Sequence, residues 1–192
     1  THRWELRSLA AHKAMQSNQA LYAVIHGGLN PELRKKSCTV LSGADFDGFA
    51  IGGSLGKTRE DMLSVLNMTV PHLPTEYPRH LLGIGDSASL KEAVLFGIDT
   101  FDCSHPTKAA RHGLLFIAAG AQRATRAGAS ATFGPIEDGC ACFTCKQYSL
   151  AYLCHLFKAH ELLAYSLASI HNLYFMARMM EKIREAIMRD EL

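Results

Sequence analysis

Three cysteines close together in the sequence form its strongest chemical signal. They are Cys140, Cys142 and Cys145. Thiolates at this spacing can fill three positions of a tetrahedral Zn²⁺ and leave the fourth to another ligand. Three histidines further along could supply that ligand: His155, His160 and His171. We favour His171, because a helix carrying it can pack against the cysteine loop. Four protein ligands predict a structural zinc ion, and three free, buried cysteines are the alternative.

One carboxylate also stands at a position suited to chemistry. Asp102 follows the apolar segment 97–101 and precedes a polar stretch, so we expect it to project from the end of a strand into a loop. There it could act as a nucleophile or a general base. An aspartate after a strand can equally form a turn or cap a helix.

The segment after Asp102 is basic. No Asp or Glu occurs between Cys103 and Ile136, and four cations do: Lys108, Arg111, Arg123 and Arg126. A positive segment beside a carboxylate could contact the phosphates of a nucleic acid. The alternative is a solvated loop whose charges have no partner.

Two further residues are weaker candidates for binding. His26 precedes Gly27-Gly28 and could form a hydrogen bond to a substrate, although a structural role is common for such a histidine. Gly53 could offer its backbone N–H to a ligand, because no side chain blocks close approach; it could also simply permit a turn.

These residues need a framework, and the first hundred positions predict one. Short apolar runs at 19–25, 48–51, 79–84 and 97–101 alternate with helix-start signals at Asn30, Thr58 and Asp86 or Ser87. Strand, glycine turn and helix in repetition predict a parallel sheet. His26, Gly53, the stretch 83–86 and Asp102 then lie at the carboxyl ends of strands, where both closed barrels and open doubly wound sheets carry their chemistry.

The pattern changes near Leu150, where apolar residues recur at steps of three and four. Two amphipathic helices interrupted near residues 158–160 explain this pattern. We therefore divide the chain into residues 1–135, with the strands and their helices, and residues 136–192, with the cysteine cluster and the terminal helices.

The composition limits the class of protein. The 192 residues are 48% hydrophobic and carry a formal net charge of +2, which suits a folded domain and argues against intrinsic disorder. The longest nearly uncharged apolar run, residues 114–121, is far shorter than the roughly 18–20 residues of a membrane helix. Charged residues near the start argue against a signal peptide, and clustered cysteines favour a reducing compartment, so we expect a cytoplasmic protein.

Taken together, the motifs resemble those of the queuine tRNA-ribosyltransferases, also called tRNA-guanine transglycosylases. The resemblance rests on GIDTFDC at 97–103, PTKAARHG at 106–113, the cysteine cluster with SIHNL at 169–173, VIHGG at 24–28 and GFAIGG at 48–53. It covers essentially the whole chain in order. It implies an α/β fold, the C-terminal half of a (β/α)8 TIM barrel with a zinc-binding helical subdomain, and a chain that is a piece of a longer protein.

The resemblance also implies the activity. The family exchanges guanine at the anticodon wobble position of tRNA for a 7-deazaguanine base, queuine or its precursor, and its members are homodimers with one structural Zn²⁺ per subunit. Asp102 would be the nucleophile, His26 and Gly53 would bind the base, and Cys140, Cys142, Cys145 and His171 would bind zinc. The residues implied in tRNA contact are Gly83, Ile84, Gly85, Asp86, Ser87, Ala88, Ser89, Thr107, Lys108, Ala109, Ala110 and Arg111.

Three positions depart from the family pattern. His26 stands where glutamine is usual, Lys57 where glutamate is expected, and Lys108 where arginine is usual. The first two predict an altered base pocket. Two other functions stay open: a non-catalytic, zinc-containing tRNA-binding subunit of a heterodimer, and a zinc-stabilised α/β domain without an RNA role. Retention of Asp102 favours the enzyme over the first, and the acid-free basic segment disfavours the second.

Overall fold

The computed structural model describes all residues, 1–192, and divides them into two compact units. Unit 1 is Thr1–Cys103 and unit 2 is Ser104–Leu192. None of the helices combines the length and the apolar composition that crossing a lipid bilayer requires. The boundary between the units falls earlier in the chain than the division at residues 135 and 136 drawn from the sequence pattern, which remains a prediction.

Unit 1 is an α/β unit built on a four-stranded parallel sheet, as the alternating pattern predicts. Its elements are α1 (His2–Ala14), β1 (Tyr22–Ile25), α2 (Pro31–Ser42), β2 (Gly48–Ile51), α3 (Arg59–Thr69), the 3-10 helix η1 (Val70–His72), β3 (Arg79–Leu81), α4 (Ser87–Leu95) and β4 (Thr100–Phe101). The strands lie in the order β1-β2-β3-β4, all parallel. Sequence neighbours are therefore spatial neighbours throughout, and the order never reverses.

Local capping explains where three of the helices begin. Asn30 accepts a hydrogen bond from the backbone N–H of Leu33 at the start of α2, and Pro31 follows as the first helical residue. Thr58 and Asp61 form a reciprocal capping box at the start of α3. The side chain of Asp86 accepts from the N–H of Ser89 and caps α4. All three predicted helix starts are confirmed.

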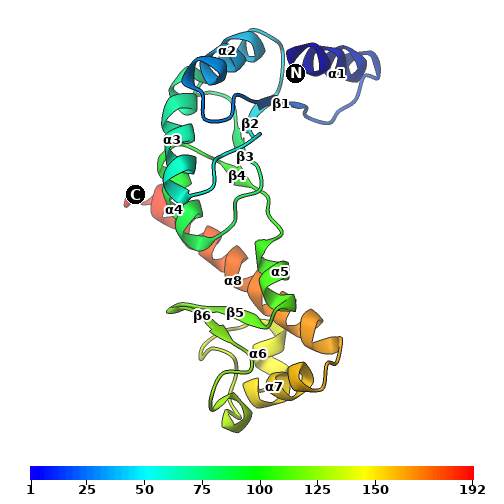
Figure 1. Cartoon of the computed structure of the whole chain (residues 1–192), viewed down its shortest axis with the longest axis vertical. Helices are drawn as coiled ribbons and strands as arrows, with labels where there is room; N and C mark the ends of the chain where they lie inside the picture. Colours follow the sequence, from blue (N-terminus) through cyan, green and yellow to red (C-terminus); the bar gives the residue numbers. More distant parts are fainter. The chain divides into compact units, whose positions relative to one another are not determined.

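The helices of unit 1 cover one side of its sheet. Figure 1 shows α2, α3 and α4 on the same side of the strands, and α2 packs on α3 while α3 packs on α4. Right-handed crossovers between consecutive parallel strands produce this arrangement. Ile25, Phe49, Ile51 and Leu81 of the strands form the core with apolar residues of the helices. The carboxyl ends of the four strands are thereby held in register at one edge.

Unit 2 contains a hairpin and several helices. Its elements are α5 (His105–Arg111), β5 (Leu114–Ile117), β6 (Gly120–Arg123), η2 (Ala129–Ala131), α6 (Phe143–Gln147), α7 (Leu150–Lys158) and α8 (Leu163–Met188). The helices α7 and α8 are the two predicted amphipathic helices, and the chain turns between them at His160, which has a φ of 57°. The basic segment contains α5 and the antiparallel β5–β6 pair, which the sequence pattern does not reveal.

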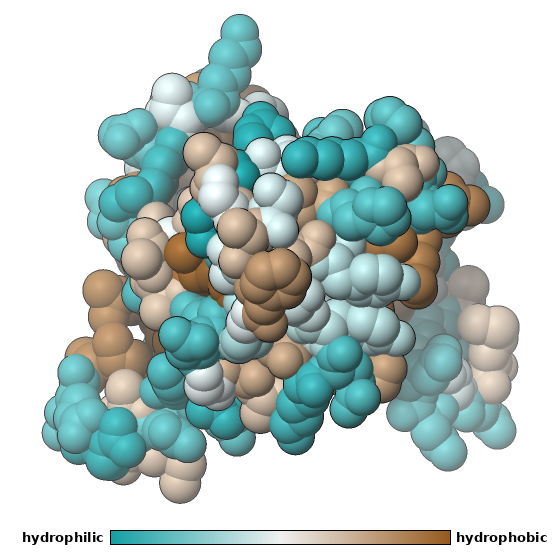
Figure 2. All heavy atoms as spheres, turned by 90° about the horizontal axis from the view of Figure 1, so that it is seen from below, coloured by the Kyte–Doolittle hydropathy of each residue, from teal (hydrophilic) through white to brown (hydrophobic).

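The surface of unit 2 exposes several large apolar side chains. Phe133 is 84% exposed, and Phe143 and Tyr152 are also exposed. Two of the rings around them pack together, since Tyr148 stacks on Tyr152 at a centroid distance of 5.4 Å. The space-filling view shows hydrophobic side chains at the centre of one face, bordered by hydrophilic ones (Figure 2). Exposed apolar groups bordered by polar residues are typical of surfaces that bind other macromolecules.

Candidate active site and metal centre

Four predicted residues lie at the carboxyl ends of the four strands. His26 follows β1, Gly53 follows β2, Gly83 follows β3 and Asp102 follows β4. His26 and Gly53 are close neighbours, because a methyl group added at Gly53 would lie 3.2 Å from His26 Nδ1. Gly83 and Asp102 are in direct contact, since the Gly83 N–H donates to Asp102 Oδ1 at 3.2 Å. The sheet thus brings these residues together in two neighbouring pairs.

Asp102 is exposed and ionised. Its side chain is 60% exposed, and both hydrogen bonds that it accepts, from His80 and from Gly83, end on Oδ1. The hydrogen bond from His80, followed by that from the Gly83 N–H, lowers the pKa of the Asp102 carboxyl below its ordinary value. Oδ2 accepts no hydrogen bond. A carboxylate of this kind can attack an electrophilic carbon, because one oxygen is held and the other is open to solvent.

His80 is a site residue that the sequence analysis missed. It lies on β3 in register with Thr100 on β4. Its Nε2 lies 3.0 Å from Asp102 Oδ1, and its Nδ1 lies 2.9 Å from Thr100 Oγ1. The only signal in the sequence is a histidine in the middle of an apolar run, and the contact with Asp102 requires the strand register to be known.

Arg34 is a second residue that the sequence analysis missed. Its side chain is fully buried and donates to three backbone carbonyls: Gly28 O at 2.9 Å, Ile25 O at 2.9 Å and Ser54 O at 3.0 Å. Ile25 is the last residue of β1, and Gly28 and Ser54 lie in the segments that follow β1 and β2. Arg34 therefore holds the two loops that carry His26 and Gly53.

Glutamate and lysine residues border the same loops. Glu5 Oε1 lies 3.9 Å from His26 Nε2, and Glu5 Oε2 accepts from the backbone N–H of Val24 at 3.5 Å. Lys57 is exposed, and its backbone N–H donates to Asp61 Oδ2 at 2.8 Å. The edge near His26 is therefore lined by an acid and an imidazole.

The stretch 83–89 serves mainly to shape a turn and begin a helix. Gly85 is buried against Cys103, because a methyl group added there would lie 1.6 Å from Cys103 Sγ. Asp86 caps α4, and Ser89 is buried. Gly83, Ser87 and Ala88 are exposed and Ile84 is half-buried, so these four remain accessible to a ligand.

The stretch 107–111 lies within α5 and divides by exposure. Ala109 and Ala110 are buried, Thr107 donates through Oγ1 to Ser104 O at 3.2 Å, and Lys108 and Arg111 are exposed. Lys108 and Arg111 are three residues apart, so they share one face of the helix. Only these two of the five predicted residues present charge to solvent.

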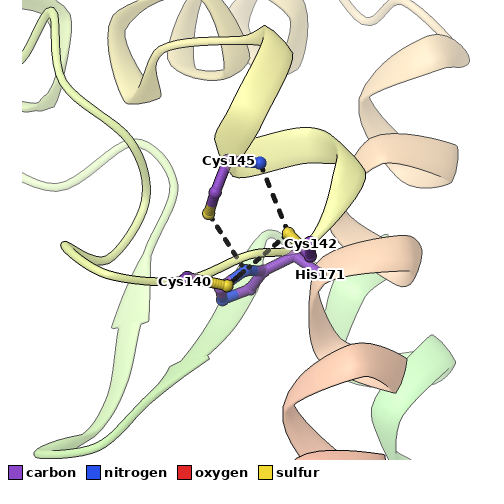
Figure 3. A group of neighbouring side chains, drawn as sticks. All are labelled: Cys140, Cys142, Cys145 and His171. Carbon is purple, nitrogen blue, oxygen red and sulfur yellow. Dashed lines mark hydrogen bonds between the residues drawn. The ribbon is translucent and has the colours of Figure 1, made fainter.

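The predicted metal ligands converge in unit 2. Cys140 and Cys142 come from the loop before α6, Cys145 from α6 and His171 from α8 (Figure 3). Their four ligand atoms all lie within 4.8 Å of one another. His171 Nδ1 lies 3.7 Å from Cys140 Sγ, 3.6 Å from Cys142 Sγ and 3.5 Å from Cys145 Sγ. Both other candidates, His155 and His160, are exposed and lie outside the cluster.

These distances fit a tetrahedral metal ion. Zinc–sulfur and zinc–nitrogen bonds of ordinary length place the ligand S and N atoms roughly 3.6 Å apart at a tetrahedral angle. His171 Nε2 donates to Phe116 O at 2.7 Å, which leaves Nδ1 as the electron-pair donor that faces the sulfurs. Burial lowers the pKa of His171, so the ring stays neutral. The set of three sulfurs and one nitrogen suits a divalent metal ion such as Zn²⁺.

A sequence profile of the family "Queuine tRNA-ribosyltransferase" matches residues 1–192. The chain belongs to this family. It is 54% identical over 190 residues to a queuine tRNA-ribosyltransferase of Protochlamydia amoebophila, covering 99% of this chain and 49% of that protein. It is 50% identical to that of Chlamydia muridarum and 48% identical to that of Chlamydia felis, in each case over 100% of this chain and 52% of the relative.

Membership of the queuine tRNA-ribosyltransferase family confirms the resemblance drawn from the motifs. The chain spans about half the length of the curated relatives that it matches. The strand-end residues of unit 1 and the cluster of unit 2 therefore belong to a chain that corresponds to about half of a full-length member of the family.

Proposed function

We propose that this chain is the part of a tRNA-guanine transglycosylase that carries the nucleophile. The reaction would exchange guanine at the anticodon wobble position of tRNA for a 7-deazaguanine base, queuine or its precursor. The observation that carries the proposal is Asp102, an exposed carboxylate at the end of β4 with one oxygen held by two hydrogen bonds and the other open. Family membership of the whole chain supports it.

The exchange would proceed in two displacements at the ribose C1′ carbon. Asp102 Oδ2 forms a bond to C1′ while the bond from C1′ to N9 of guanine breaks, and the departing purine takes the electron pair and accepts a proton from water. N9 of the incoming base then forms a bond to C1′, and the bond from C1′ to Oδ2 breaks. Two inversions restore the original configuration, as in retaining glycosidases.

His26 and Gly53 would bind the base. Both follow strands of the sheet edge that also carries Asp102, and Arg34 holds their loops. An imidazole can donate or accept a hydrogen bond, and the Gly53 backbone can approach a flat ring closely because it has no side chain. Unstacking of the target base would be needed for it to reach this edge.

Contacts to tRNA would come from two stretches. In 83–89, the accessible residues Gly83, Ile84, Ser87 and Ala88 would face the RNA. In 107–111, the exposed cations Lys108 and Arg111 would contact phosphates, which attract positive side chains without regard to sequence. Ser89, Ala109 and Ala110 would support these contacts from within their helices, and Asp86 would do so as the cap of α4.

The unreversed order of the four parallel strands supports a segment of a TIM barrel, because doubly wound sheets reverse their strand order. We propose that the chain forms the C-terminal half of such a barrel, with the remaining strands supplied from outside it. Exposed apolar side chains of unit 2, including Phe133 and Phe143, support association into a homodimer.

Zinc is the metal we propose for the cluster. Cys140, Cys142, Cys145 and His171 would hold one Zn²⁺ per chain and fill all of its tetrahedral positions. A zinc ion with four protein ligands has no position open for substrate, so its role would be structural. It would stabilise the packing of α6 against α8, which the bond from Thr144 Oγ1 to Leu167 O also joins at 2.7 Å.

The test is Asp102→Asn in the full-length protein. We expect loss of guanine exchange and of the covalent tRNA complex on a denaturing gel, with tRNA affinity retained within about tenfold. Asp45→Asn serves as the matched control, because Asp45 is exposed and pairs with Lys13. Exchange at the wild-type rate in Asp102→Asn would contradict the proposal and favour a non-catalytic tRNA-binding subunit.

A further inference from the structure

We propose that His80 is a positioning residue for the nucleophile: it selects Oδ2 of Asp102 as the attacking oxygen and promotes departure of the carboxylate in the second displacement. This inference rests on the function proposed above. His80 lies on β3, and Asp102 follows the adjacent strand β4, 22 positions further along the chain.

The geometry fixes the imidazole at both of its nitrogens. Nε2 lies 3.0 Å from Asp102 Oδ1 and Nδ1 lies 2.9 Å from Thr100 Oγ1, and the side chain is only 20% exposed. An ionised carboxylate can only accept hydrogen bonds, so Nε2 carries the hydrogen. In the neutral ring, Nδ1 then accepts from the Thr100 hydroxyl. Thr100 therefore orients His80, and His80 orients Asp102.

The two donors act on the same oxygen. His80 Nε2 and the Gly83 N–H converge on Oδ1, while Oδ2 accepts no hydrogen bond. Rotation of the carboxylate would break both bonds, so the orientation of the group is set. Oδ2 is the oxygen with free electron pairs toward solvent, and it would form the bond to C1′ while Oδ1 becomes the carbonyl oxygen of the resulting ester.

The hydrogen bond from His80 has opposite effects on the two displacements. A donor binds an ionised carboxylate more strongly than the carbonyl of an ester. It therefore stabilises Asp102 when the residue is free, which makes it a weaker nucleophile and a better leaving group. In the second displacement the electron pair of the Oδ2–C1′ bond returns to the carboxylate, N9 of the incoming base bonds to C1′, and its N–H proton passes to water.

His80 is also the one titratable side chain that acts on Asp102 in unit 1. The other groups that face the carboxylate are the Gly83 N–H and, behind the imidazole, the Thr100 hydroxyl, and neither changes charge at ordinary pH. Protonation of Asp102 would remove the attacking carboxylate and so produce an acid limb in the exchange rate. Removal of the His80 donor raises the pKa of this carboxyl and moves that limb to higher pH.

The experiment compares His80→Phe and His80→Gln in the full-length protein. Phenylalanine keeps the ring and removes the donor, and the glutamine amide can place an N–H near the position of Nε2. His72→Phe is the matched control, because His72 is an exposed histidine of the same unit. Three quantities are measured: decay of the isolated covalent tRNA complex after guanine is added, the fraction of complex at steady state, and the pH profile of guanine exchange.

We expect decay of the complex to be about tenfold slower in His80→Phe, the size of effect for one hydrogen bond to a charged group. The complex should accumulate above the wild-type fraction, and the acid limb should move to higher pH. In His80→Gln, each of the three quantities should return most of the way to its wild-type value, and His72→Phe should match the wild type. A merely structural role predicts the opposite, since a misplaced Asp102 would form less complex.

The outcomes separate this inference from the proposed function. In one outcome the wild type forms the covalent complex and Asp102→Asn does not. In the same outcome His80→Phe forms no more of the complex than the wild type does, and its acid limb lies at the wild-type pH. The role of His80 is then overturned while the proposed function stands. His80→Phe gives no measurement if that variant does not fold. In that case the inference is overturned when His80→Gln departs from the wild-type decay rate and acid limb. Absence of the complex in the wild type overturns both.

Discussion

At the scale of single residues, the buried Arg34 stabilises two loops of unit 1, although it belongs to no recognisable sequence motif. Its guanidinium has no carboxylate partner and instead donates to the backbone carbonyls of Gly28, Ile25 and Ser54. Burying a cation costs free energy unless its N–H groups form hydrogen bonds, and here each of the three guanidinium nitrogens donates to one carbonyl. The conformations of the loops after β1 and β2 thus depend on one side chain from α2.

Replacement of Arg34 tests this dependence. We expect Arg34→Met to lower the free energy of unfolding by about 2–4 kcal/mol, because three backbone carbonyls lose their donor and one of them, Ile25 O, is buried. Arg34→Lys should be intermediate, since an ammonium cannot reach three carbonyls in a fork. Urea unfolding of the full-length protein measures the change. The control Arg59→Lys, at an exposed arginine that pairs with Glu92, should cost under about 1 kcal/mol; an equal loss in control and test would refute the assignment.

At the scale of elements, the sequence predicted the helix starts but not the register in which the strands pair. The helices α2, α3 and α4 begin where Asn30, Thr58 and Asp86 predict, because a cap lies within a few residues of the N–H that it accepts from. The contact of His80 with Asp102 depends on the pairing of β3 with β4. The hairpin β5–β6 lacks alternating polar residues and a familiar turn pair, so nothing in its sequence predicts it.

The candidate metal cluster was predictable for the same reason as the caps. Cys140, Cys142 and Cys145 are neighbours in sequence, whereas His171 was one of three candidates and only the packing of α8 distinguishes it. The strand-end positions of His26, Gly53 and Asp102 followed from the alternation of elements. Their side-chain partners, Arg34 and His80 above all, come from distant parts of the chain and could not be read from spacing.

The loop after β3 contacts the end of β4 at Gly85, so a substitution of Gly85 tests how strictly that contact must be kept. A methyl group at Gly85 would lie 1.6 Å from Cys103 Sγ, so Gly85→Ala must displace the residue beside Asp102, the proposed nucleophile. We expect guanine exchange to fall about 10- to 100-fold, as small misplacements of reacting groups do. The double variant with Cys103→Gly, which removes the clashing atoms, should recover part of the rate.

Gly134→Ala is the matched control for this substitution. An added methyl group there would meet nothing within 4 Å, and the backbone is not in the left-handed region. Exchange in this variant should equal the wild-type rate. A Gly85→Ala protein that is as active as Gly134→Ala would show that the end of β4 tolerates the displacement, contrary to our expectation.

At the scale of the whole molecule, the two compact units carry different kinds of chemistry. Unit 1 carries the carboxylate and the loops at its sheet edge, and unit 2 carries the four ligand atoms of the cluster. Each has a core of its own. Loss of the metal should therefore destabilise one unit and leave the hydrogen bonds of the other intact.

Metal removal tests this separation. We expect a chelator, or His171→Ala, to raise amide hydrogen exchange in α6, β5 and the first half of α8 by more than about 100-fold, because metal binding stabilises such sites strongly. Exchange in β1 to β4 should not change. His155→Ala, at an exposed histidine outside the cluster, should keep one metal ion per chain and wild-type protection; retention of the metal in His171→Ala would contradict the assignment.

Phe116 of β5 connects the cluster to the hairpin in an unusual way. Its carbonyl oxygen accepts from His171 Nε2 at 2.7 Å, and its backbone N–H donates to Asn172 Oδ1 at 2.9 Å. Adjacent residues of α8 thus hold both backbone polar groups of one residue, and these groups belong to the two peptide units on either side of its Cα. A bound cation withdraws electron density from the His171 ring, and this change passes through one hydrogen bond to the peptide that joins Phe116 to Ile117. The amide resonance of Ile117 is consequently a natural reporter of occupancy, readable without any added label on the ligands themselves.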